Sequence, residues 1–320
     1  MTHKQNKESK LRALAGSLVY ELQYKHKLEL LKLPPHKASE RLEQLIVEDQ
    51  LLFRAHMAGT ISQVPPYFIT KYLFQPHKAS ESVMAELSIL EAVAQAGNLD
   101  QLPPAILNLE ILARPNNSYK NTALHFAAAN ITPSTLKFFT RYTLSLSNQN
   151  QQTVLHQAAA HGQLNKLNTD EISEEMLLST NSNGQTPLAL ALYNNHSSSI
   201  PLAIISERIL THTTQNSGHG ENLVEIATYF GLRNGLARPL EWIPRQLFTP
   251  KIITTICETI INRQIGKAYK ENVLNSLLGL DIDDKYKEIT GDNWWKENQK
   301  ILQSKNKISH SVQHSEIAMF

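Results

Sequence analysis

One ten-residue pattern returns along this chain at a nearly constant spacing, and it constrains the fold more than any other feature. The copies are SILEAVAQAG from Ser88, TALHFAAANI from Thr122, TVLHQAAAHG from Thr153 and TPLALALYNN from Thr186, with a weaker copy, NLVEIATYFG, from Asn222. Successive copies start 31 to 36 residues apart. Self-similarity at such a period indicates an array of repeated units rather than one globular core.

A second string follows most copies and extends the unit. It reads ISQVPPYFITKYLF from Ile61, LDQLPPAILNLEIL from Leu99, LNKLNTDEISEEML from Leu164 and LEWIPRQLFTPKII from Leu240. Counting back from the first of these strings, QLLFRAHMAG from Gln50 fits the same register. Six repeats are therefore expected, with starts near residues 50, 88, 122, 153, 186 and 222.

The local chemistry of each copy predicts a short helix that begins at its first residue. A threonine hydroxyl there can accept a hydrogen bond from a backbone N–H that has no partner inside the helix. Proline suits the first helical turn because its missing donor would be unpaired there. Pro187 fills this place in one copy, and Pro66, Pro104 and Pro244 are expected to open second helices.

Polar clusters rich in Asn, Gln and Gly precede three of the helices. They are NNSYKN at 116–121, NQNQQ at 148–152 and NSNGQ at 181–185. These residue types favour turns. The sequence therefore predicts projecting turns between the units.

The TxLHxAA…HG string of the Thr153 copy closely resembles the ankyrin repeat, strongly over 118–196 and moderately over 45–117 and 197–255. In that family the histidine bonds to the threonine and to the backbone of a neighbouring turn. The resemblance thus implies an all-α fold, an ankyrin-repeat solenoid with helical N- and C-terminal caps. It also implies a structural role for Thr122, His125, Thr153, His156, Gly162, Thr186 and Pro187.

The flanks of the repeats predict helical caps. Leucines at 11, 14, 18 and 22 have helical spacing, and the ends of a solenoid need covering. The last residues are polar and lack periodicity, which favours disorder. The expected organisation is an N-terminal helical cap at 1–44, an ankyrin-like array at 45–255, a C-terminal helical cap at 256–303 and a disordered tail at 304–320.

Composition narrows the possible functions. A net charge of +2 predicts neither nucleic-acid binding nor strong attraction to a membrane surface. No apolar run approaches the length of a membrane span. The single cysteine, Cys257, excludes an intrachain disulfide framework and indicates a reducing compartment. A cytoplasmic location is expected.

No catalytic or metal site is predicted. No nucleophile, base and orienting group fall together, and the histidines do not gather into the three or four ligands that zinc requires. The run DIDD at 281–284 resembles the start of a calcium loop, but Lys285 and Tyr286 stand where an acceptor and a glycine are needed. The sequence predicts no cofactor.

The resemblance to ankyrin repeats implies a scaffold or adaptor that binds a protein partner through the concave face of the array. Turns that project from a rigid stack can vary without disturbing its core. The positions expected to contact the partner are Tyr119, Lys120, Phe126, Gln149, Gln151, Gln157, His161, Asn183 and Tyr193.

Two alternatives remain open at the level of sequence. One is an enzyme with its activity in the helical flanks and the repeats as a targeting arm. The other is a bacterial effector exported to the cytosol of a host cell, since the Pro-Pro second string looks more like bacterial ankyrin arrays than the eukaryotic consensus. In that case the tail ending SEIAMF would carry the secretion signal.

Overall fold

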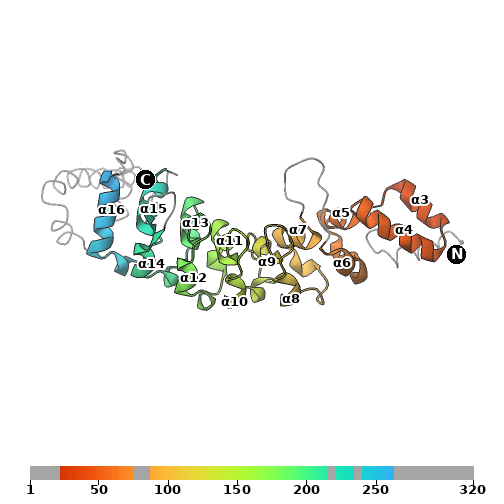
Figure 1. Ribbon diagram of the computed structural model, residues 1–320, viewed down its shortest axis with the longest axis horizontal. Coiled ribbons are helices and arrows are strands. Elements are labelled where there is room, and N and C mark those ends of the chain that lie inside the picture. The colour runs from red at the N-terminus through yellow and green to blue at the C-terminus, as the bar shows by residue number, and fades with distance from the viewer. Residues whose placement is uncertain (1–21, 75–86, 215–220, 234–239, 263–320) are drawn as a thin grey trace, which may run out of the picture. The chain divides into compact units, whose positions relative to one another are not determined.

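The computed structural model describes residues 22–74, 87–214, 221–233 and 240–262 (Figure 1). Over these residues the chain is mostly helical, with many short helices packed one after another, which confirms the predicted predominance of helix. The two strands of the described residues are β1 (Thr213–Thr214) and β2 (Glu221–Asn222), which pair in antiparallel fashion. The chain divides into two compact units, Met1–Met176 and Leu177–Phe320.

The first unit contains paired helices joined by tight turns. Its α-helices are α3 (Tyr24–Lys32), α4 (Pro35–Glu48), α5 (Leu51–Met57), α6 (Pro66–Tyr72), α7 (Ile89–Gln95), α8 (Leu109–Leu112), α9 (Ala123–Ala127), α10 (Arg141–Leu144) and α11 (Val154–Ala160), and α12 (Glu174–Leu178) runs across the boundary between the units. Its 3-10 turns are η1 (Ile61–Gln63), η2 (Leu99–Gln101), η3 (Leu136–Phe138), η4 (Leu164–Lys166) and η5 (Thr169–Glu171).

The second unit continues with longer helices toward its end. They are α13 (Pro187–Tyr193), α14 (Glu207–Thr211), α15 (Leu223–Arg233) and α16 (Pro250–Asn262), with 3-10 turns η6 (Ser197–Ser199), η7 (Leu202–Ile204) and η8 (Arg245–Leu247). Within this unit α15 packs against α13, α14 and α16.

Each of the six predicted copies forms a helix that begins one residue after its first residue, namely α5, α7, α9, α11, α13 and α15. Side-chain caps explain several of these starts. Thr153 accepts from the backbone N–H of His156, and Thr186 accepts from that of Ala189. The predicted capping chemistry is thus present at both residues.

Four of these helices are followed by a residue in the left-handed conformation and then by a 3-10 turn. The left-handed residues are Gly59, Gly97, Gly162 and Asn195, with φ between 64° and 75°. At Gly97 a Cβ atom would lie 2.7 Å from Nδ2 of Asn130, so both the backbone angle and the close approach favour glycine there. The helix α9 is shorter, and after it Ile131 holds the matching position without adopting this conformation.

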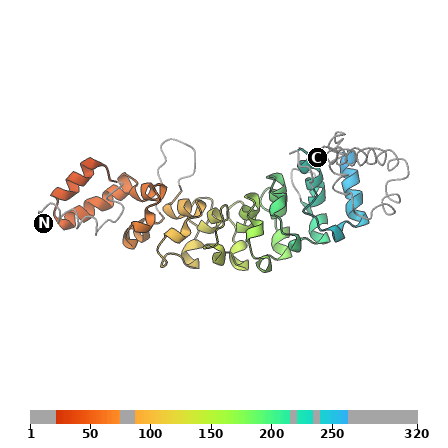
Figure 2. The ribbon, with the colours of Figure 1, turned by 180° about the vertical axis from the view of Figure 1, so that it is seen from behind.

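Small and branched apolar side chains build the core of the first unit. The helix α7 packs against α9, and α9 packs against α11. Figures 1 and 2 show these three helices in one row, and α8 and α10 lie in a second row beside it. Leu124 and Leu155 are fully buried, and so are Ala127, Ala128, Ala158 and Ala159. The small alanine side chains let these helices approach closely.

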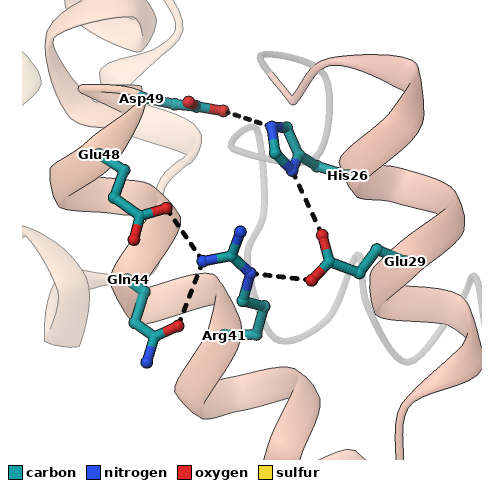
Figure 3. A network of polar contacts seen from close by, with 6 residues as sticks. All are labelled: His26, Glu29, Arg41, Gln44, Glu48 and Asp49. Carbon is teal, nitrogen blue, oxygen red and sulfur yellow. Dashed lines mark hydrogen bonds and ion pairs between the residues drawn. The ribbon is translucent and has the colours of Figure 1, made fainter.

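A polar network joins α3 to α4 at the start of the described chain (Figure 3). Its members are His26, Glu29, Arg41, Gln44, Glu48 and Asp49. Arg41 lies 2.9 Å from both Glu29 and Glu48, and the hydrogen bond from Arg41 lowers the pKa of Glu29. His26 connects the two helices again, through Oδ2 of Asp49 at 3.2 Å.

Several expectations about the flanks differ from the structure or lie outside it. The boundary expected after residue 44 falls inside α4, and the one expected after residue 255 falls inside α16. The first three leucines of the N-terminal stripe lie outside the described residues. So do most of the C-terminal cap at 256–303, with the acidic run at 281–284, and all of the tail at 304–320.

Three prolines were expected to begin the second helix of a repeat unit. This expectation is correct for one of them and wrong for the other two. Pro66 is the first residue of α6. Pro104 instead lies in a turn, and α8 starts at Leu109, because the side chain of Asn108 caps it by accepting from Ile111 N at 3.0 Å. Pro244 precedes only the 3-10 turn η8.

Candidate functional site

Three turns share one geometry, and an asparagine side chain organises each of them. Its Oδ1 accepts the backbone N–H groups two and four residues later, at 2.9–3.1 Å. The asparagines are Asn117, Asn148 and Asn181, the last of them in the second unit. Asparagine favours this arrangement because its side chain can replace a backbone acceptor. The predicted polar clusters therefore form turns of a defined shape.

The fourth residue of each turn has a left-handed backbone. It is a glycine in the second unit, Gly184, but a lysine and a glutamine in the first, Lys120 with φ 57° and Gln151 with φ 56°. A residue with a Cβ atom is less stable in this conformation by about 1 kcal/mol or more. These two turns of the first unit thus keep long side chains where glycine fits more easily.

The two turns of the first unit lie side by side, and we call their exposed residues the tip surface: Tyr119, Lys120, Gln149, Asn150 and Gln151. All five residues are exposed. The turns are joined by a hydrogen bond of 2.7 Å from Gln149 N to Tyr119 O. A second bond, of 2.8 Å, runs from Asn148 Nδ2 to Asn121 Oδ1. These hydrogen bonds therefore fix the two turns relative to one another.

The remaining predicted contact residues lie on helices, directly after a helix, or in the other unit. Phe126 on α9 and Gln157 on α11 are half-buried, and His161 is exposed. Gln157 donates to Gln152 Oε1 at 2.7 Å, so part of its hydrogen-bonding capacity is used inside the protein. The exposed Asn183 and the half-buried Tyr193 belong to the second unit. Neither is part of the tip surface.

His125 links the start of its own helix to the next turn. Its Nδ1 lies 3.1 Å from Thr122 N and 2.9 Å from Thr122 Oγ1, and its Nε2 lies 3.1 Å from the carbonyl oxygen of Gln152. Since a backbone N–H only donates and a carbonyl only accepts, the ring carries its proton on Nε2. Burial lowers the pKa of His125 from 6.5 to about 4. The ring is therefore neutral at pH 7.

His156 occupies the same place in the following helix and is fully buried. Its Nδ1 lies 3.1 Å from Thr153 N and 2.7 Å from Thr153 Oγ1. Within the described part of the chain, no group of three or more His, Cys, Asp or Glu side chains could hold a metal ion. The same residues contain no helix long and apolar enough to cross a membrane.

Glu91 supports the first turn of the tip surface, and the sequence alone did not identify it. It holds the place of His125 and His156 in α7 and is 1% exposed. It forms a reciprocal cap with Ser88, and its other oxygen accepts from Asn117 Nδ2 at 2.7 Å. The S-x-x-E spacing is a capping signature that could have identified the cap, but only the structure shows the contact with the turn.

The chain matches no protein-family model, and no curated protein matches its sequence.

Proposed function

We propose that this protein is a scaffold that binds another protein through the tip surface, on an array of ankyrin-like units. The observation that carries the proposal is the pair of exposed long side chains, Lys120 and Gln151, at left-handed backbone positions. Strained backbone conformations often occur where function requires a particular side chain. Neither Lys120 nor Gln151 is buried, so packing of the core does not account for them.

The composition of the tip surface supports a protein as the ligand. It joins one tyrosine with three amide side chains, and antibody loops use a similar mixture of Tyr and Asn. Tyr119, which is 52% exposed, offers a large rigid contact area. Each amide side chain offers both a donor and an acceptor, as a peptide group does.

The local architecture also supports an ankyrin-like arrangement. Capped helices are followed by left-handed residues and 3-10 turns, and Asn-organised turns precede three of the helices. The contacts of His125 with Thr122 and with the Gln152 carbonyl are those that the resemblance implies. The two alternatives place activity in the flanks or a signal in the tail, and residues 263–320 lie outside the described chain.

Replacing both strained residues with glycine is expected to abolish binding while preserving the fold. Lys120→Gly with Gln151→Gly removes the two side chains and relaxes the backbone. The free energy of unfolding should stay unchanged or rise by up to about 1 kcal/mol per site, because glycine tolerates positive φ. Affinity for the partner should fall at least about tenfold, as expected when central contact residues are removed. Affinity capture from cytoplasmic extract with quantitative mass spectrometry measures the loss.

Asn195→Gly is the matched control. Asn195 is also exposed and left-handed, with φ 64°, but it lies outside the tip surface. This variant should capture the partner as the wild type does. Equal capture by the Lys120→Gly, Gln151→Gly variant and the wild type would refute the proposed site. A loss of capture with Asn195→Gly alone would move the site to the second unit.

A further inference from the structure

The carboxylate of Glu91 connects the start of α7 to the first turn of the tip surface. Its Oε2 accepts from Ser88 N at 2.7 Å and from the Ser88 hydroxyl at 2.9 Å. Its Oε1 accepts from Asn117 Nδ2 at 2.7 Å. The side chain is buried, so these three donors replace the water that a carboxylate otherwise binds.

The orientation of the Asn117 amide is fixed by its other contacts. Its Oδ1 accepts from Tyr119 N and from Asn121 N, each at 3.1 Å, so the Nδ2 group faces Glu91. Tyr119 O in turn accepts from Gln149 N in the second turn. Hydrogen bonds therefore connect the cap of α7 to both turns that carry the tip surface.

The neighbouring helix α9 is also connected to a turn, but through a different pair of groups. There Nε2 of His125 donates to a backbone carbonyl, that of Gln152. In the first turn the partner is a side-chain donor, Asn117 Nδ2, and only an acceptor can pair with it. Glu91 and Asn117 are thus a matched acceptor and donor.

We propose that Glu91 is a positioning residue that, through Asn117, holds Tyr119 and Lys120 in the arrangement that binds the partner. The inference rests on the proposed function of the tip surface. Glu91 is buried and does not contact the partner itself. Its effect on affinity comes from the order that it imposes on the turn.

A swap of the two groups tests the inference. In Glu91→Gln the new Nε2 group faces Asn117 Nδ2, donor against donor. In Asn117→Asp two carboxylates face each other. In the double variant the introduced glutamine amide donates to the introduced aspartate carboxylate, the glutamine Oε1 accepts from Ser88, and the net charge equals that of the wild type.

Amide hydrogen exchange at Tyr119 and Asn121, in the free full-length chain, reports the order of the turn without any partner.

Each single variant is expected to speed exchange at these two amides by about tenfold or more, because local opening becomes easier. Each should also weaken binding of the captured partner, and the double variant should restore both properties. If the single variants fail to fold, restoration by the double variant alone supports the inference. A double variant no better than the single ones, or single variants with unchanged exchange, would overturn it.

The two readouts separate this inference from the proposed function. Restored exchange with partner affinity unchanged in every variant would show that the tip surface is not the binding site. The proposed function would then be wrong, and with it the effect of Glu91 on affinity. Suppose instead that the Glu91 and Asn117 variants leave amide exchange unchanged, while the Lys120→Gly, Gln151→Gly variant loses binding. That result would refute only the positioning role of Glu91 and would leave the proposed function standing.

Discussion

Acidification from pH 7.5 to pH 4.5 is expected to lower the free energy of unfolding by about 2.5 kcal/mol through His125 alone. The ring is neutral in the folded chain, where burial lowers its pKa from 6.5 to about 4. The unfolded chain takes up a proton near pH 6.5 and the folded chain only near pH 4. Between these values the unfolded state binds more protons, so stability falls as the pH falls.

The geometry explains why the folded chain resists this protonation. A proton on Nδ1 would oppose the Thr122 N–H that donates to this atom at 3.1 Å. Urea unfolding, followed by circular dichroism at both pH values, measures the effect. Since carboxylates also titrate in this range, the wild type is compared with His125→Gln.

The glutamine amide can accept from Thr122 and donate to the Gln152 carbonyl, but it does not titrate. The variant should therefore lose about 2.5 kcal/mol less than the wild type between the two pH values. Equal losses in the two proteins would contradict a buried neutral His125.

His156→Ala is expected to lower the free energy of unfolding by about 3 kcal/mol. The substitution leaves the Thr153 N–H without its acceptor, which costs about 1–3 kcal/mol, and opens a cavity at a fully buried position. Urea unfolding at pH 7.5 measures the loss. Binding should decline only in proportion to the loss of folded protein.

His161→Ala is the control for this substitution. His161 follows α11 and is exposed, and its replacement should change stability by no more than about 0.5 kcal/mol. A His156→Ala variant that stayed as stable as the wild type but lost a specific activity would assign His156 a chemical role instead of a structural one.

The starts of the helices could be predicted from the sequence because they depend on local chemistry. Capping joins residues three positions apart, as in Thr153 and His156, so a short motif contains all the information. The failure at Pro104 has a local cause as well. Asn108 offers a side-chain acceptor four residues later, and the helix begins there.

The supports of the tip surface join residues that are distant in sequence, so only the one that the ankyrin resemblance implies, the bond from His125 to a neighbouring turn, could be predicted. His125 contacts Gln152 across 27 positions, and Glu91 contacts Asn117 across 26. The sequence placed Tyr119, Lys120, Gln149 and Gln151 in turns, and all four are exposed. It gave no sign that Glu91 holds one of those turns, since the aligned His125 bonds to a backbone carbonyl instead.

Hydrogen exchange of the complex tests the central claim most directly. The captured partner is added to the full-length chain, and amide exchange is compared with and without it. The account predicts slower exchange at 116–121 and 148–152, with little change at α8, α10 and α16. Slower exchange confined to those three helices, with both turns unchanged, would contradict binding at the tip surface.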